Sequence, residues 1–218
     1  MIDKFVPTLA DAMAGIQDGS IVLLAGFGAG TPETLVRGLI DQGARNLTLV
    51  CNAGGREDGP IADILATERV SKLICSFVRP GSVAAVLYTA GKLDLEIVPQ
   101  GTLAERIRAA GAGVQGFYTP TAADTVLAED RETRVINGRN CLLEYPINAD
   151  VALIDAWQAD RWGNLTHRES ARNFNPIMAM AAKLSIVQTR HVVNLGDIPP
   201  EHVHTAGVFV NRILHVPA

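Results

Sequence analysis

The first half of this chain alternates four times between a short apolar run and a segment with helix-forming character. Strands that alternate with helices form βαβ units, in which successive strands run parallel and the crossovers are right-handed. The sequence therefore predicts an α/β fold with an open, mostly parallel sheet and flanking helices. The strands are expected at residues 21–25, 47–50, 73–77 and 95–98, and the helices at 32–42, 60–68, up to Ala90, and from Thr102 onward.

The second half has a different pattern. Residues 134–144 predict a β-hairpin, because Asn137-Gly138 is the dipeptide that a type I′ turn prefers. No sequence repeat, low-complexity tract or linker interrupts the chain, so we expect a single domain over residues 1–218. The remaining elements are expected as strands at 151–156, 186–188 and 208–216, a short helix at 8–17, and a helix capped by Asn175-Pro176 that runs to about Ala182.

Composition excludes several classes of protein. A formal net charge of −4 without a basic cluster argues against a nucleic-acid partner. The N-terminal residues lack signal-peptide character, and no apolar run reaches the roughly 20 residues that span a bilayer. Cys51, Cys75 and Cys141 are widely spaced and match no metal-ligand pattern, which favours a reducing compartment. We therefore expect a cytoplasmic protein with no membrane contact and no bound metal.

The stretch from Ile21 to Glu33 is a candidate binding element. An apolar run leads into a glycine-rich turn, Gly26 to Gly30, and a helix is expected to follow. Thr31 suits the N-cap, Pro32 the first helical position and Glu33 the positive end of the helix dipole. Exposed N–H groups at such a junction favour a phosphate or another anion. A tight connection without a ligand is equally compatible with this pattern.

Polar residues follow the other predicted strands at intervals of about 25 residues. These residues are Asn52, Ser76 and Gln100. Ligands of open parallel sheets bind at the carboxyl ends of the strands, so we expect the three side chains to share one edge with the glycine turn. Neutral donors suit an acyl carbonyl, a carboxylate or an oxyanion, and we expect Ser76 and Gln100 to face the substrate. Alternatively, Asn52 and Gln100 only satisfy loop backbone groups.

Other site chemistries lack their signatures. A dinucleotide site needs an acid where this chain has Cys51-Asn52, and the Gly-Lys-Ser/Thr sequence of nucleotide triphosphatases is absent. His202 and His204 have no third ligand and are read as surface residues. No nucleophile elbow is present. The candidate carboxylates Glu33, Glu57 and Glu144 form no recognisable acid/base pair, and the first and last have structural explanations. The chain therefore carries no catalytic nucleophile of its own and resembles half of a site.

Long segments of the chain are similar to the A subunits of the family I coenzyme A transferases, especially their 3-oxoadipate and succinyl-CoA:3-oxoacid branches. The resemblance runs nearly end to end. The matching segments are Asp18–Pro32, Val98–Arg108, Gly111–Gly113, Phe117–Thr121, Asp160–Thr166 and Ser170–Pro176.

The resemblance implies an acyl-CoA and a 3-oxo acid as substrates, with coenzyme A bound as a thioester substrate rather than as a tightly held cofactor. It also implies a separate B subunit, paired as αβ or α2β2, whose glutamate is the nucleophile of a ping-pong reaction through a glutamyl-CoA thioester. Position by position, Asn52 matches an asparagine on the CoA side and Gln100 a glutamine near the reacting group. The CoA-facing loop corresponds to Gly26, Phe27, Gly28, Ala29, Gly30 and Thr31.

The chain departs from the family pattern in four loops. Ala25 replaces a glycine, and the loop from Phe27 to Pro32 is one residue short. One asparagine is missing beside Asn52, and residues 80–85 and 122–125 differ from the usual sequences. An alternative on the same fold is therefore a non-catalytic protein that binds acyl-CoA or regulates an enzyme. By contrast, a sugar-phosphate isomerase on a related fold would need an acid/base pair that we do not find.

Overall fold

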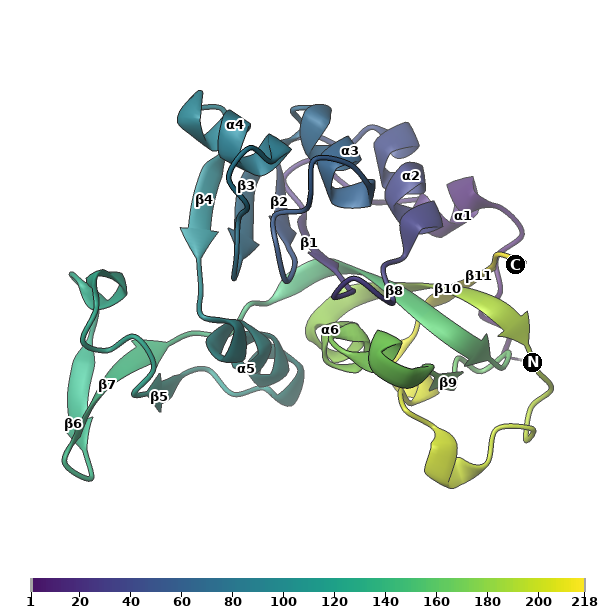
Figure 1. Cartoon of the computed structure of the whole chain (residues 1–218). Helices are drawn as coiled ribbons and strands as arrows, with labels where there is room; N and C mark the ends of the chain where they lie inside the picture. Colours follow the sequence, from purple (N-terminus) through teal and green to yellow (C-terminus); the bar gives the residue numbers. More distant parts are fainter. Residues whose placement is uncertain (1, 218) are drawn as a thin grey trace.

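The structure, a computed structural model, describes residues 2–217 and is built around an eight-stranded sheet (Figure 1). Its strand order is β11-β10-β8-β1-β2-β3-β4, and all of these pairs are parallel. The strands are β1 (Ile21–Leu24), β2 (Leu47–Val50), β3 (Val70–Cys75), β4 (Asp94–Ile97), β8 (Ala149–Ala159), β10 (Ala182–Val192) and β11 (Arg212–His215), with β9 (Leu165–Thr166) antiparallel to β8. The predicted open, mostly parallel α/β sheet is confirmed.

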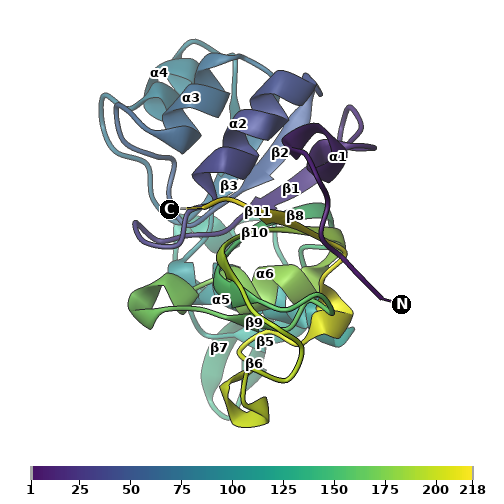
Figure 2. The ribbon, with the colours of Figure 1, turned by 90° about the vertical axis from the view of Figure 1, so that its right-hand side faces the viewer.

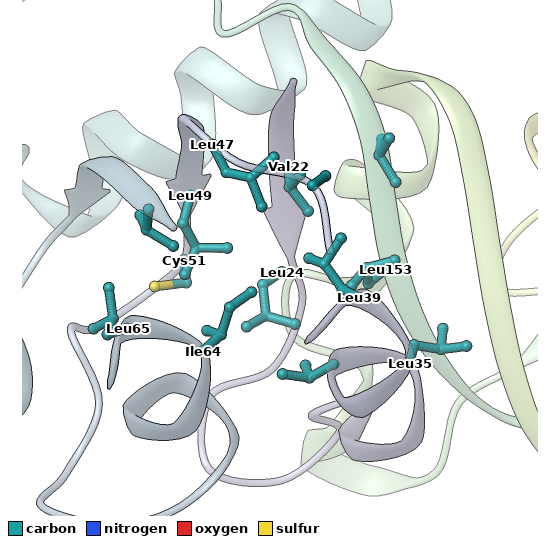
Figure 3. Close-up of a cluster of buried hydrophobic side chains, with 14 of the residues drawn as sticks. Val22, Leu24, Leu35, Leu39, Leu47, Leu49, Cys51, Ile64, Leu65 and Leu153 are labelled. Carbon is teal, nitrogen blue, oxygen red and sulfur yellow. The ribbon is translucent and has the colours of Figure 1, made fainter. Parts of the chain in front are cut away.

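Helices cover both faces of this sheet (Figure 2). One face carries α1 (Leu9–Met13), α2 (Glu33–Gln42), α3 (Pro60–Ala66) and α4 (Val83–Thr89), and the other carries α5 (Gln100–Ala112) and α6 (Asn175–Ala181). Side chains of a strand alternate between the faces. Accordingly, Val22 and Leu24 belong to the first core, whereas Leu23 and Ala25 belong to the second. Figure 3 shows the first core, where leucines of α2 and α3 pack on β1 and β2.

A second, three-stranded antiparallel sheet projects from the end of α5 (Figure 1). It consists of β5 (Phe117–Thr119), β6 (Thr133–Ile136) and β7 (Arg139–Glu144). The predicted hairpin is confirmed, because Ile136 pairs with Arg139 and both turn residues have positive φ, 51° at Asn137 and 75° at Gly138. The third strand of this sheet, β5, is absent from the sequence prediction.

Several predicted element boundaries are wrong. The helix expected from Thr102 onward begins earlier, at Gln100, and Thr102 is buried inside it. Asn175 is the first residue of α6 rather than its cap, and Phe174 holds the N-cap position. The strand expected at 208–216 is shorter because residues 207–209 form a 3₁₀ turn. Such turns within residues 2–217 are η1 (Val126–Ala128), η2 (Glu169–Arg172), η3 (Pro200–His202) and η4 (Gly207–Phe209).

Within residues 2–217, none of the helices has both the length and the apolar character that crossing a membrane requires.

Candidate functional site

The glycine loop, residues 25–32, leaves the carboxyl end of the central strand β1 and depends on two glycines. Gly26 has a φ of 114°, and a Cβ there would collide with Thr31 Oγ1 and lie 2.9 Å from Thr31 Cα. Gly30 has a φ of 73°, and a Cβ there would lie 2.5 Å from the carbonyl oxygen of Ala171. Any side chain at either position would displace the backbone. The two glycines therefore let the loop fold back on itself and approach η2.

Two asparagines hold the glycine loop from outside. Asn173 Nδ2 donates to Ala29 O at 2.9 Å, and Asn175 Nδ2 donates to Gly30 O at 3.2 Å. Asn175 is fully buried, and its Oδ1 accepts a hydrogen bond from the backbone N–H of Asp155 at 2.7 Å. The sequence prediction missed these roles, because an asparagine beside proline at a helix start is read locally as a cap. The signal that could have found them is the pair of asparagines on either side of Phe174.

The start of α2 is capped by a side chain from β10, a strand distant in the sequence. Thr31 is not the N-cap and Pro32 is not the first helical residue; Pro32 holds the cap position, and no side chain of its own caps the helix. Instead, Gln188 on β10 accepts hydrogen bonds from Thr34 N at 3.1 Å and Leu35 N at 3.4 Å. These donors are the ones that would have bound an anion. Thr34 N and Leu35 N are therefore occupied by Gln188 and not available to an anion at this helix start.

The donors available to a ligand lie in the glycine loop itself. Phe27 N donates to Ala29 O at 3.1 Å, which closes the loop on one side. Among the described residues, the N–H groups of Gly28, Ala29, Gly30 and Thr31 donate to no protein acceptor. The loop therefore offers backbone donors where the helix does not.

The three polar residues at the strand ends come together as predicted. Gln100 Nε2 donates to Asn52 Oδ1 at 2.6 Å, and Ser76 Oγ donates to the Asn52 carbonyl oxygen at 2.6 Å. Within residues 2–217 neither amide side chain bonds to loop backbone, so the alternative role considered from the sequence is not the observed one. Asn52 Oδ1 accepts the hydrogen bond from Gln100. Among the described residues, Asn52 Nδ2 donates to no protein acceptor. Only 4% of Asn52 is exposed.

Two pockets lie on either side of the glycine loop. The first, here named the Asn52 pocket, has a volume of about 590 Å³, and the second, the His167 pocket, about 540 Å³. Gly28, Thr31 and Glu33 line both of them. Ser76 and Gln100 do not line the Asn52 pocket. Instead, both donate hydrogen bonds to Asn52, which does line it. The Asn52 pocket is lined by Gly26, Phe27, Gly28, Thr31, Glu33, Asn52, Ala53, Gly55, Arg56, Asp58, Gly59, Pro60, Ile61 and Arg79.

The His167 pocket contains no free acid/base pair among the residues that the structure describes. Burial lowers the pKa of His167 to about 4, so its imidazole is neutral at neutral pH. Its Nδ1 lies 2.9 Å from the Asp155 carbonyl oxygen, which can only accept, and its Nε2 lies 2.9 Å from Thr205 Oγ1. Burial also raises the pKa of the Asp155 carboxyl, to which Gln188 Nε2 donates at 2.8 Å. Both ring nitrogens are thus occupied by structural hydrogen bonds.

The thiols beside the site are unsuited to nucleophilic attack. Cys51 and Cys75, at the ends of β2 and β3, are buried, and burial raises the pKa of both, that of Cys75 to about 11. A protonated thiol is a poor nucleophile. Over residues 2–217, no group of three or more His, Cys, Asp or Glu side chains gathers where it could hold a metal ion. The site offers neutral donors that can bind and orient a carbonyl or carboxylate.

Known proteins resemble this chain over almost its whole length. The family model described as coenzyme A transferase matches residues 6–215. The A subunit of the 3-oxoadipate CoA-transferase of Pseudomonas putida is 52% identical over 219 residues, which cover 99% of this chain and 95% of that protein. The A subunit of the probable succinyl-CoA:3-ketoacid coenzyme A transferase of Bacillus subtilis (strain 168) is 42% identical over 212 residues, covering 97% and 89%.

The fold also occurs in solved structures. An acyl-CoA transferase from E. coli O157:H7, crystallised as a thioester complex with CoA, superposes with a TM-score of 0.83 at 20% identity. The match covers 99% of this chain and 47% of that chain. This chain thus corresponds to somewhat less than half of the longer protein.

Proposed function

This chain belongs to the coenzyme A transferase family, and on that premise we propose that it is the A subunit of a transferase that moves CoA from an acyl-CoA such as succinyl-CoA to a 3-oxo acid such as 3-oxoadipate. The observation that carries the proposal is the Asn52 pocket. Asn52, which Gln100 holds, lines it together with Gly28 and Thr31, whose N–H groups donate to no acceptor among the described residues. Such donors stabilise the oxyanion that forms when a carboxylate attacks a thioester.

The proposed partner is a B subunit that supplies the missing nucleophile. The described residues contain no activated nucleophile beside the pocket, and the relatives at 52% and 42% identity are named as A subunits. The longer E. coli chain, of which this fold fills 47%, also supports a second half. We propose an αβ or α2β2 assembly located in the cytoplasm.

In the proposed reaction, a glutamate carboxylate supplied by the partner attacks the thioester carbonyl of the donor. The carbon–sulfur bond breaks, leaving an acyl-glutamyl anhydride and CoA thiolate. The thiolate then attacks the glutamyl carbonyl, which releases the donor acid as a carboxylate and forms a glutamyl-CoA thioester. The acceptor acid reverses these two steps, so the kinetics are ping-pong.

Asn52 and the glycine loop act on each tetrahedral intermediate of this sequence. The Asn52 amide hydrogens and the N–H groups of the loop donate to the developing oxyanion, which requires donors held in place before the reaction. Gln100 and Ser76 hold Asn52 in that orientation through its Oδ1 and its backbone oxygen. Gln100 is itself exposed, so its remaining amide hydrogen is free to reach the substrate.

The test is co-expression of this chain with its partner, followed by an assay of thioester exchange between succinyl-CoA and a panel of 3-oxo acids. We expect transfer to at least one acid and parallel lines in initial-rate plots, as ping-pong kinetics requires. A stable complex that transfers CoA to no acid of the panel contradicts the proposal. Calorimetry with CoA on the isolated chain is the companion measurement, because tight binding without the partner would favour a non-catalytic binding protein.

A further inference from the structure

Resting on the proposed function, we infer that Arg79 selects substrates with a second, terminal carboxylate and thereby makes the enzyme a transferase of dicarboxylic acids. On the proposed function the reacting group binds beside Asn52, and Arg79 lines the same pocket from the loop after β3. The pocket has a volume of about 590 Å³.

Arg79 is the arginine of this pocket that has no acidic residue beside it in the chain. Two arginines line it, Arg56 and Arg79, and among residues 2–217 neither takes part in an ion pair. Arg56 is followed in the chain by Glu57 and Asp58, and Asp58 lines the pocket as well. The segment around Arg79, residues 76–82, contains no acidic residue. A guanidinium without a carboxylate partner is free to pair with one on the substrate.

The backbone that carries Arg79 is fixed, although its side chain is exposed. The Arg79 carbonyl oxygen accepts from Ser82 Oγ at 2.8 Å and from Ser82 N at 3.2 Å. Ser82 is 1% exposed and caps α4 through Ala85 N. Gly54 N donates to Phe77 O at 2.8 Å, which ties the Arg79 loop to the loop that follows Asn52. The backbone of Arg79 therefore has a fixed position relative to Asn52 before the substrate binds, which reduces the conformational entropy lost on binding.

The charges around the pocket indicate where a second carboxylate binds. Glu33 and Asp58 line it from α2 and from the loop before α3, so a substrate carboxylate is repelled from those sides. The guanidinium of Arg79 offers the planar pair of N–H donors that a carboxylate matches bidentately. In ping-pong transfer the donor acid and the acceptor acid occupy the site in turn. Arg79 can therefore pair with the second carboxylate of each. A monocarboxylic 3-oxo acid such as acetoacetate leaves Arg79 without a partner.

The experiment compares Arg79→Ala and Arg79→Lys with the wild-type complex of both subunits, using 3-oxoadipate and acetoacetate as acceptors. In a ping-pong reaction, kcat/KM for the acceptor does not depend on the donor, so succinyl-CoA serves throughout. We expect Arg79→Ala to lower kcat/KM for 3-oxoadipate by roughly 10- to 100-fold, the effect of losing hydrogen bonds to a charged group. For acetoacetate we expect little change. Arg79→Lys keeps the charge but not the bidentate geometry, and should fall between the two.

The control is Arg37→Ala, which removes an exposed arginine of α2 that lines neither pocket. We expect it to leave the preference between the two acids unchanged. An equal loss on both acids in Arg79→Ala, or no loss on 3-oxoadipate, overturns the inference.

A binding measurement separates this inference from the proposed function. Calorimetry on the two-subunit complex compares succinate with butyrate, which has a methyl group in place of the second carboxylate. We expect succinate to bind more tightly to the wild type and this advantage to disappear in Arg79→Ala. If the wild-type complex transfers CoA to no acid, the proposed function fails, and the binding measurement alone then tests the role of Arg79. Tighter binding of succinate than of butyrate that persists in Arg79→Ala overturns the inference.

Discussion

At the scale of single residues, long polar side chains replace local backbone capping around the site. Gln188 is the example: its amide accepts from the first turn of α2 and donates to Asp155, although 154 residues separate it from Thr34. Gln188 is 7% exposed, so its hydrogen bonds are shielded from water. The amide of Gln100 orients Asn52 in a comparable way at the neighbouring strand ends.

Replacing Gln100 by alanine should lower kcat of the two-subunit complex by roughly 10- to 1,000-fold, the range for losing one oxyanion donor or its support. Without the 2.6 Å hydrogen bond to Oδ1, the Asn52 amide is free to rotate away from the reacting carbonyl. Steady-state kinetics gives kcat and KM, and Gln115→Ala, an exposed glutamine outside both pockets, is the control. An unchanged kcat in a folded complex would assign Gln100 to the scaffold.

His167 makes stability depend on pH. The folded protein holds the pKa of this histidine at about 4, against an ordinary value of 6.5 in the unfolded chain. Between these values the unfolded chain binds more protons, so stability falls as the pH is lowered from about 6.5 to about 4 and changes little below that. The full contribution is on the order of 3 kcal/mol.

The His167 prediction is tested by comparing the urea unfolding of the wild type and of histidine variants across this pH range. In His167→Gln we expect a lower stability at pH 7 and a flatter dependence on pH, whereas His202→Gln, which removes an exposed histidine, should follow the wild type. Curves for wild type and His167→Gln that run parallel from pH 7 to pH 4 would falsify the assignment.

At the scale of elements, the strands and their order along the chain were predictable, whereas the helix starts were not. The buried runs of β1, β2 and β3 and the polar residues after them are local patterns, so Asn52, Ser76 and Gln100 could be placed at one edge in advance. The contacts of Asn173, Asn175 and Gln188 with the glycine loop and α2 join residues more than 140 positions apart. Local sequence rules contain no information on such distant partners. They therefore assign the helix cap to a nearby residue, Thr31 for α2 and Asn175 for α6.

The glycine loop provides a matched pair of substitutions. Gly28 and Gly30 have similar φ values, 78° and 73°, so alanine at either position costs about 1–2 kcal/mol for its left-handed conformation. A Cβ at Gly28 meets no atom within 4 Å, whereas at Gly30 it would lie 2.5 Å from the Ala171 carbonyl oxygen. We therefore expect Gly30→Ala to lower both thermal stability and CoA transfer more than Gly28→Ala. Equal effects on the melting temperature would show that the contact with η2 is not needed.

At the scale of the whole molecule, an ion-pair cluster joins the projecting antiparallel sheet to the main body. Glu144 at the end of β7 is 2% exposed, and its Oε2 lies 2.8 Å from Arg131 Nη2 and 3.7 Å from Arg106 Nε on α5. Neither approach has hydrogen-bond geometry at Oε2, so the attraction there is electrostatic. Arg106 also pairs with Glu96 on β4 at 2.7 Å. The cluster thus connects both sheets through α5.

Removing the central carboxylate should destabilise the protein. We expect Glu144→Ala to cost about 1–2 kcal/mol, less than for a fully buried pair, since Arg131 loses its carboxylate partner but is partly solvated and Arg106 keeps Glu96. Glu105→Ala, which removes an exposed partner of Arg108 on α5, should cost about 0.2–0.5 kcal/mol. Chemical denaturation measures both, and limited proteolysis shows whether residues 117–144 become accessible. A Glu144→Ala cost no larger than that of the control would contradict a role in joining the sheets.

The position of β1 in the sheet has a consequence for biosynthesis. One edge of β1 pairs with β2, only a helix away in the chain, but the other pairs with β8, where Val22 is opposite Val151. A ribosome adds roughly 5–20 residues per second, so the second edge of β1 stays open for on the order of ten seconds after the strand is made. An open apolar edge is a template for pairing with other chains. The second edge of β1 is therefore exposed until β8 is made, and slower translation before residue 151 would extend that exposure.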